Sequence, residues 1–188
     1  MRCFAVTLLG LCALLGPASG ARAQPDIALL LDHGFAVMRH GGAVPAPPGT
    51  RPPVPGCDPG AVLTDTGRDE MRRWGEALRQ AGLGAARLRT SRQCSAWETA
   101  LLLALGPVMP DPDLDPGDRA TTDARAAALR ERILLGERAR QPGQEPVIFI
   151  THRANIVALT GIEAAHGELL LLGTSGPALG LLGRLIME

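Results

Sequence analysis

The stretch Val147-Ile148-Phe149-Ile150, VIFI, is the clearest β-strand in this sequence. Its side chains are β-branched or aromatic and no polar residue interrupts them, so both faces of the strand should be buried. Other strands are expected at 35–38, 86–90, 168–172 and 179–186. Helical patterns separate most of these runs. This alternation predicts an α/β fold, a three-layer α/β/α sandwich around a mostly parallel central sheet.

The expected helix with the clearest signals follows residue 63. Thr64 or Asp65 can cap its first turn, and glycines at 82 and 84 can end it. One face of this helix carries Gly67, Met71, Trp74 and Leu78. Further helices are expected at 97–105, 122–140 and 155–160.

Two segments are expected to be irregular. Seven prolines lie within residues 43–60, and because proline interrupts both helices and sheets, no regular element is expected there. A loop of this length in a compact domain is usually a lid or a binding loop. The second irregular segment is an acidic loop at 110–117.

The first 23 residues predict a cleavable signal peptide. Arg2 is a short basic segment, residues 4–15 are an apolar core, and Ala21-Arg22-Ala23 fits the pattern before a cleavage site. The apolar run is shorter than the roughly 20 residues that a membrane-spanning helix needs. We therefore expect one domain at 24–188 that is periplasmic or secreted. A formal net charge of zero indicates neither a nucleic-acid partner nor binding to an anionic membrane surface.

Cys57 and Cys94 remain once Cys3 and Cys12 leave with the signal peptide. An even number of cysteines in an exported chain predicts a disulfide, and two buried free thiols are the alternative. A bond between them would tie the proline-rich loop to the segment that follows the strand at 86–90.

Histidines follow two of the expected buried strands. Residues 36–42 read AVMRHGG, so Arg39 and His40 end one apolar run, and His152 follows VIFI in the same way. Ligands of open α/β sheets bind outside the carboxyl ends of strands, so the two histidines are expected to face each other across one pocket. A neutral imidazole can attack phosphorus while an arginine holds the phosphoryl oxygens, and Gly41 lets a backbone carbonyl fix the ring's tautomer. Neither histidine has a second ligand at a spacing typical of metal sites, so we expect no metal and no other cofactor.

Four segments give the sequence a resemblance to a known family. They are VMRHG at 37–41, LTDTGRDEMRRWGEAL at 63–78, TSRQCSAWETA at 90–100 and VIFITHRANIVALTG at 147–161. In order and spacing they resemble the histidine phosphatase superfamily, which implies a phosphoglycerate-mutase-like fold. Within it, the chain is similar to small exported bacterial members through Gly56-Cys57, Cys94 and Gly167-Glu168. The resemblance implies that His40 is the nucleophile, that Arg39 and His152 bind phosphate, and that a second arginine completes the site.

The second arginine is where this sequence departs from the family pattern. Counting back from Thr99-Ala100 places Ser95 at its position. Loss of the paired charge-assisted hydrogen bonds of one guanidinium group would cost roughly 1.5–3 kcal/mol or more of phosphate stabilisation. Arg92, one helical turn earlier, and Arg153, beside His152, are candidate replacements, although an arginine in either place is more often simply a solvated surface residue.

The residue that protonates the leaving group is also open. Glu168, at the start of an expected strand, is the first candidate, and Asp113 and Asp115 in the acidic loop are the alternatives. His33 and His166 lie beside glycines in expected turns, so we expect them to be surface residues.

These features predict an exported, cofactor-independent phosphomonoesterase that forms phosphohistidine on His40. Its partner would be a phosphorylated small molecule or a phosphoprotein. The alternative, favoured by Ser95, is a catalytically weak or inactive family member that binds a phosphorylated ligand or a component of the cell envelope.

Overall fold

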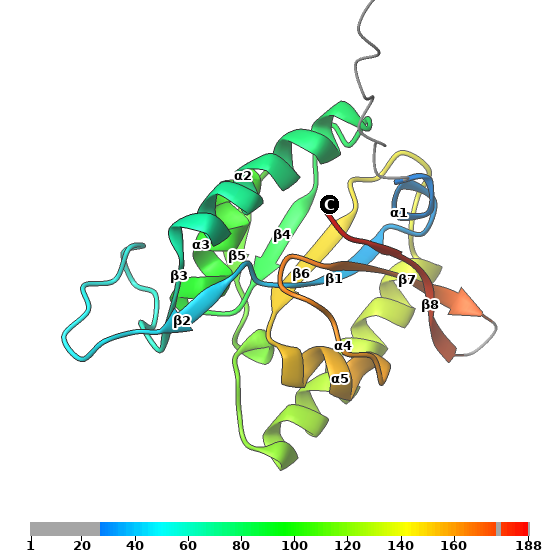
Figure 1. The fold of residues 1–188 in the computed structure, drawn as a ribbon. Helices are drawn as coiled ribbons and strands as arrows, with labels where there is room; N and C mark the ends of the chain where they lie inside the picture. The colour runs from blue at the N-terminus through cyan, green and yellow to red at the C-terminus, as the bar shows by residue number, and fades with distance from the viewer. Residues whose placement is uncertain (1–26, 176–177, 188) are drawn as a thin grey trace, which may run out of the picture.

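A six-stranded sheet forms the centre of the computed structural model, which describes residues 27–175 and 178–187 (Figure 1). The predicted signal peptide lies outside the described residues. The strand order is β5-β4-β6-β1-β7-β8. The strands are β1 (Phe35–Arg39), β4 (Arg87–Thr90), β5 (Val108–Pro110), β6 (Val147–Thr151), β7 (Leu169–Ser175) and β8 (Ala178–Leu185).

Most of the sheet is parallel, as predicted. Parallel pairs join β5 to β4, β4 to β6 and β6 to β1, whereas β7 is antiparallel to both of its neighbours. The carboxyl ends of β1, β4 and β6 therefore meet at one edge of the sheet, where ligand sites of α/β proteins form.

Helices cover both faces of the sheet. They are α1 (Ala28–His33), α2 (Asp65–Gln80), α3 (Cys94–Leu103), α4 (Arg119–Arg138) and α5 (Arg153–Thr160). Alternate residues of β6 belong to two separate apolar cores: Ile148 and Ile150 pack with α2 and α3, and Val147 and Phe149 pack with α4 and α5. Burial on both faces explains why VIFI is continuously apolar. It also confirms the three-layer sandwich.

The amphipathic pattern of α2 is confirmed. Thr64 caps the helix by accepting a hydrogen bond from the Gly67 N–H at 3.0 Å, and Trp74 on the inner face is 2 % exposed. Gly67 packs against the backbone of Gly42, where a Cβ atom would overlap the Gly42 carbonyl group. Because Gly67 has no side chain, α2 can lie directly against the segment that follows His40.

Two helices begin three residues before their predicted starts. α3 starts at Cys94, and α4 starts at Arg119, where Asp118 caps it by accepting a hydrogen bond from the Thr121 N–H at 2.8 Å. The elements α1 and β5 are too short to show a clear period in the sequence. None of the described helices is long and apolar enough to span a bilayer.

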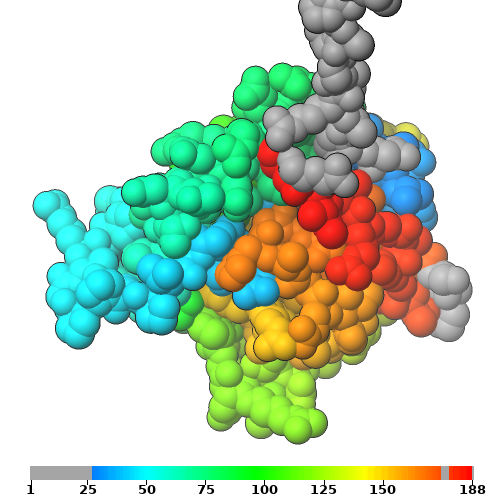
Figure 2. All heavy atoms as spheres, viewed as in Figure 1, coloured from blue at the N-terminus to red at the C-terminus, as the bar shows by residue number. Residues whose placement is uncertain are grey.

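The expectation that residues 43–60 hold no regular element is wrong for the first three of them. β2 (Ala43–Pro45) pairs antiparallel with β3 (Ala61–Leu63) in a separate two-stranded sheet. Both strands are edge strands, and an edge strand can accommodate a proline such as Pro45 at its end. The rest of the loop extends from the body of the molecule as an arm, coloured cyan in Figures 1 and 2. The acidic loop contains the short 3-10 helix η1 (Pro112–Leu114). A proline fits its first position, because the N–H group that proline lacks would have no partner within the helix.

A disulfide joins Cys57, near the end of the arm, to Cys94 at the start of α3, and it confirms the predicted pairing. The two Cα atoms are 5.0 Å apart, and both cysteines are buried beside Val54. Backbone hydrogen bonds from Asp58 N–H to the Arg92 carbonyl and from Cys94 N–H to the Asp58 carbonyl hold the same junction. The end of the arm is therefore fixed to α3.

Candidate active site

His40 and His152 lie side by side beyond the carboxyl ends of two neighbouring parallel strands. Arg39 of β1 is in register with Thr151 of β6, and the His40 N–H donates to the Thr151 carbonyl at 3.1 Å. The centroids of the two imidazole rings are 5.1 Å apart. Solvent reaches only 8 % of His40 and 9 % of His152. The structure thus brings together the two histidines that the sequence places after buried strands.

Hydrogen bonding holds the His40 ring in one tautomer. Its Nδ1 atom lies 2.8 Å from the carbonyl oxygen of Gly41, and because a carbonyl only accepts, Nδ1 carries the proton. The pKa of His40 is lowered to about 4, chiefly by burial and further by His166 and Arg39, against an opposing effect of the Gly41 hydrogen bond. At neutral pH the ring is therefore uncharged and its Nε2 atom has a free lone pair.

His152 is part of a hydrogen-bonded chain that ends at a carboxylate. Its Nε2 atom lies 2.8 Å from Ser91 Oγ, which lies 3.1 Å from Asp115 Oδ1. Because a carboxylate only accepts, Ser91 donates to Asp115 and accepts from His152, so the free lone pair of neutral His152 is on Nδ1. The pKa of His152 is lowered to about 3, first by burial and then by His40, while Asp115 opposes this shift. Asn155 secures the loop by donating to the Asp115 carbonyl at 3.1 Å.

The loop between α5 and β7 holds the guanidinium group of Arg39. Nη1 donates to the Ala164 carbonyl at 2.9 Å, and Nη2 lies 2.9 Å from Nε2 of His166. The Nε atom is buried and has no hydrogen-bond partner among the described residues. His166 is exposed, as expected, but its ring centroid lies 5.2 Å from that of His40, so it is also part of the site. No sequence signal indicates this contact, because 127 residues separate His166 from Arg39.

A pocket of about 730 Å³ is lined by Arg39, His40 and His152. Arg153, one of the two candidate replacements for the missing arginine, also lines this pocket and forms an ion pair with Glu163. The other lining residues are Gly117, Arg119, Thr122, Asp123, Ala154, Val157, Ala158 and Glu163. The pocket therefore combines two histidines and an arginine with a wall of small apolar and charged side chains.

Arg92 and Ser95 are not among the residues that line this pocket. Arg92 forms an ion pair with Asp115 at 2.7 Å and lines a neighbouring pocket of about 460 Å³. Through Asp115 and Ser91 it is connected to His152, but it does not reach the histidine pocket itself. Ser95 is completely buried in α3, and its Oγ atom has no hydrogen-bond partner among the described residues.

Glu168 also lies outside the lining of the histidine pocket, and it is only 1 % exposed. Its carboxylate accepts hydrogen bonds from the Arg184 side chain and from the Ala165 N–H. Burial by itself would raise the pKa of Glu168, but these two hydrogen bonds outweigh it and lower the pKa. Asp113, an alternative donor, is likewise outside the lining and faces Arg132 at 3.8 Å.

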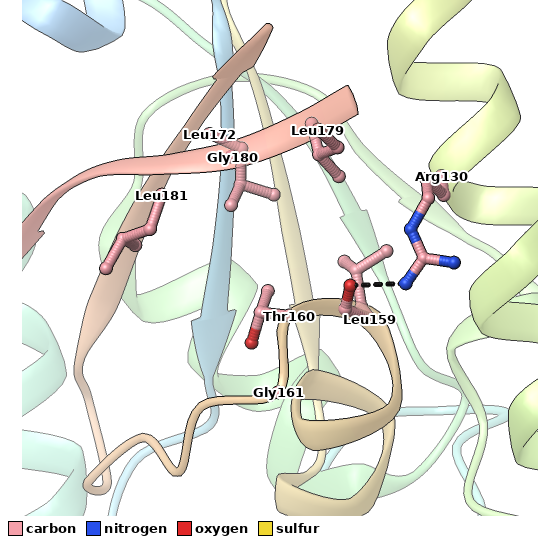
Figure 3. A pocket seen from close by; sticks show the side chains of 8 residues that line it. All are labelled: Arg130, Leu159, Thr160, Gly161, Leu172, Leu179, Gly180 and Leu181. Carbon is pink, nitrogen blue, oxygen red and sulfur yellow. Dashed lines mark hydrogen bonds between the residues drawn. The ribbon is translucent and has the colours of Figure 1, made fainter. Parts of the chain in front are cut away.

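A second pocket, of about 320 Å³, lies between the C-terminal end of α5 and the β7–β8 hairpin (Figure 3). It is lined by Arg130, Leu159, Thr160, Gly161, Leu172, Leu179, Gly180 and Leu181. Its polar side chains already bind the protein, because Arg130 donates to the Leu159 carbonyl at 2.6 Å and Thr160 to the Ile156 carbonyl at 2.7 Å. We assign it no function. Across residues 27–175 and 178–187, no group of three His, Cys, Asp or Glu side chains could hold a metal ion.

The sequence matches no protein-family model and no curated protein, whereas the structure is similar to many solved structures. The protein histidine phosphatase SixA complexed with tungstate has a TM-score of 0.52 and 18% identity, over 80% of this chain and 95% of that chain. A phosphoserine phosphatase variant from Entamoeba histolytica in complex with phosphoserine has a TM-score of 0.56 and 11% identity, over 80% and 95%. Mycobacterial glucosyl-3-phosphoglycerate phosphatase has a TM-score of 0.53 and 18% identity, over 79% and 96%.

The sheet order, the layers and these similarities together define the fold. The chain is a mixed α/β protein with a mostly parallel sheet between two helical layers. More narrowly, it has the phosphoglycerate-mutase-like fold of the phosphatases to which it is similar, which confirms the fold expected from the four sequence segments.

Proposed function

We propose that this chain is a phosphatase of the histidine phosphatase superfamily, and more narrowly a cofactor-independent phosphomonoesterase that acts through phospho-His40. The observation that carries the proposal is the free Nε2 lone pair of His40, in a pocket that also presents Arg39 and His152. The structural neighbours support it, because they are named as phosphatases and one of them holds tungstate, a tetrahedral oxyanion like phosphate.

The proposed reaction has two phosphoryl transfers. First, Nε2 of His40 attacks phosphorus, and a P–N bond forms as the P–O bond to the leaving group breaks. Arg39 donates hydrogen bonds to the phosphoryl oxygens, and the leaving oxygen takes a proton from an acid. Water then attacks the phosphohistidine, the P–N bond breaks, and one proton of that water returns to the acid as phosphate leaves.

His152 is proposed to bind the phosphoryl group through its Nδ1 atom. Without a ligand the ring is neutral at pH 7, because its pKa is lowered to about 3. A phosphoryl dianion beside Nδ1 favours the protonated ring, and Asp115 supports the same form through Ser91. Phosphate binding is therefore expected to draw one proton from solvent onto His152.

Glu163 is proposed as the proton donor, in preference to Glu168. Glu163 lines the pocket and acts electrostatically on Arg39, and it would have to leave its pair with Arg153 before it could donate a proton. Glu168 lies outside the pocket lining, and Arg184 and Ala165 bind both of its oxygens. Glu168 remains the second candidate, and a substrate-induced break of its pair with Arg184 would be needed for that role.

The substrate is proposed to be a phosphorylated small molecule or a phosphoprotein side chain. The pocket of about 730 Å³ exceeds what a phosphate group fills, and Val157 and Ala158 on its wall can contact the leaving group. The disulfide is compatible with a periplasmic or secreted protein. Cleavage of residues 1–23 belongs to the same proposal.

A binding protein without turnover is the second candidate function. The observation that favours it is Ser95, a buried hydroxyl at the position where the family resemblance implies an arginine. Arg153 lines the pocket but is already paired with Glu163, so compensation would require that pair to open.

Turnover of a panel of phosphomonoesters tests the proposal. The mature chain should hydrolyse at least one ester, His40→Asn should abolish that activity, and Arg39→Ala should raise KM and lower kcat. Addition of a metal chelator should leave the rate unchanged. Wild-type turnover in His40→Asn would exclude the phosphohistidine route.

A further inference from the structure

His166 is a third imidazole beside the phosphate-binding groups. It lies in the loop between α5 and β7, and its ring centroid is 5.2 Å from that of His40. Two of its ring atoms contact residues that line the pocket: Nε2 lies 2.9 Å from Arg39 Nη2, and Nδ1 lies 3.2 Å from the His40 carbonyl oxygen. These two contacts come from a residue that sequence alone assigns to the surface.

The chemistry of the two partners determines the state of the His166 ring. A guanidinium group only donates, so Nε2 of His166 must be the acceptor. A carbonyl only accepts, so Nδ1 must carry the proton. One neutral tautomer satisfies both contacts, and a neutral ring beside Arg39 also avoids repulsion between two cations.

The backbone of this loop is held without the His166 side chain. The Gly167 N–H donates to the carbonyls of Arg39 and His40, the Arg39 N–H donates to the Glu168 carbonyl, and the Ala165 N–H donates to the Glu168 carboxylate. The imidazole is therefore not needed to close the loop. Its contacts fix the side chain of Arg39, whose Nη1 atom also donates to the carbonyl of Ala164 in the same loop.

We infer that His166 is a positioning residue of the phosphate site, which fixes the plane of the Arg39 guanidinium group so that its remaining N–H donors face a bound phosphoryl group. The inference rests on the proposed function only in that Arg39 binds phosphate. Ser95 makes the orientation of Arg39 more important, because no guanidinium group occupies the family's second position.

Isothermal titration with inorganic phosphate tests this role in wild type, His166→Ala, His166→Gln, Arg39→Ala and the double variant Arg39→Ala with His166→Ala. Glutamine places a carbonyl oxygen near the position of Nε2, so it keeps an acceptor for Arg39. His33→Ala is the matched control, since His33 pairs with Glu137 away from the pocket. Thermal unfolding of every variant reports whether the fold is intact.

We expect His166→Ala to weaken phosphate binding about tenfold, as loss of one well-placed charge-assisted hydrogen bond would, and His166→Gln to stay within about threefold of wild type. In the Arg39→Ala background, removal of His166 should change affinity less than about twofold, because the effect passes through Arg39. The inference is overturned if His166→Ala binds phosphate like wild type, if glutamine is no better than alanine, or if the loss is equally large without Arg39.

The phosphate titration separates this inference from the proposed function. Turnover of phosphate esters with unchanged phosphate affinity in His166→Ala would overturn the inference and leave the phosphatase proposal standing. If the His166 variants show the expected phosphate affinities but the protein hydrolyses no ester, the inference stands and the phosphatase proposal is overturned. Absence of phosphate binding in wild type would overturn the inference outright.

Discussion

The Nε2 atom of His152 lies 2.8 Å from the hydroxyl oxygen of Ser91, and this contact connects the imidazole to the carboxylate of Asp115. Burial and the neighbouring His40 lower the pKa of His152, and Asp115 acts in the opposite direction. Under the proposed function, the carboxylate would favour the protonated form of His152 when a phosphoryl group binds.

Asp115→Asn should reduce proton uptake on phosphate binding. Loss of the carboxylate lowers the pKa of His152 further, so fewer phosphate-bound molecules carry the additional proton at pH 7. Titrations in two buffers of different ionisation enthalpy measure the number of protons taken up. Asp113→Asn, which changes a carboxylate outside the pocket, is the control. Equal proton uptake in wild type and Asp115→Asn would contradict the proposed role of the Ser91 contact.

The two buried histidines should make the protein less stable in mild acid. The pKa values of His40 and His152 are lowered to about 4 and about 3, from an ordinary value of 6.5. Between that ordinary value and about pH 4 the unfolded chain binds protons on these rings and the folded chain does not, so stability falls as pH falls. His40 alone should account for roughly 2–3 kcal/mol of this loss.

Urea unfolding at neutral pH and at about pH 4.5 checks this expectation. Carboxylates also titrate in this range, so the comparison of wild type with His40→Asn isolates the histidine. Asparagine can keep a hydrogen bond to the Gly41 carbonyl and does not titrate. The variant should lose clearly less free energy of unfolding than wild type, and an identical loss would show that His40 is not held neutral by the fold.

The sequence predicts the parts of this site that lie at the ends of buried strands. Continuous apolar runs reveal β1 and β6, and parallel pairing then brings His40 next to His152. The contacts of the loop between α5 and β7 cannot be predicted from apolar runs. The contact between His166 and Arg39 depends on the antiparallel pairing of β7 with β1.

Three other differences have local physical causes. Glu168 looks available at a strand start, but the β7–β8 pairing brings Arg184 onto its carboxylate. The hairpin of β2 and β3 is hidden by the prolines around it, although only Pro45 belongs to a strand. The helix starts at Cys94 and Arg119 are missed because the polar and small residues in those first turns carry no apolar period.

Substitutions at Ser95 should show whether the site lacks the second guanidinium group of the family pattern or whether another arginine supplies it. Ser95→Ala should leave stability within about 1 kcal/mol of wild type or raise it, because the buried hydroxyl has no described partner. Ser95→Arg should raise the rate of ester hydrolysis by about tenfold or more if the pocket simply lacks a guanidinium group. Steady-state rates, with thermal unfolding to confirm that Ser95→Arg folds, decide between these cases. An unchanged rate in folded Ser95→Arg, together with loss of activity in Arg153→Ala, would instead identify Arg153 as the replacement.

Glu163→Gln should slow hydrolysis of alkyl phosphates much more than hydrolysis of p-nitrophenyl phosphate. An alkoxide leaving group needs a proton, whereas p-nitrophenolate leaves without one. A loss of about a hundredfold in kcat for the alkyl ester is expected. Glu168→Gln serves as the comparison, and a larger selective loss in that variant would transfer the role of acid to Glu168.

Trapping of the covalent intermediate tests the central claim most directly. Rapid quenching of the reaction under alkaline conditions, followed by mass spectrometry of the peptide that contains residues 35–42, should reveal one added phosphoryl group on His40 of the wild-type protein. The His40→Asn variant should carry none. Steady hydrolysis of the ester with no phosphoryl group on His40 at any quench time would contradict the account.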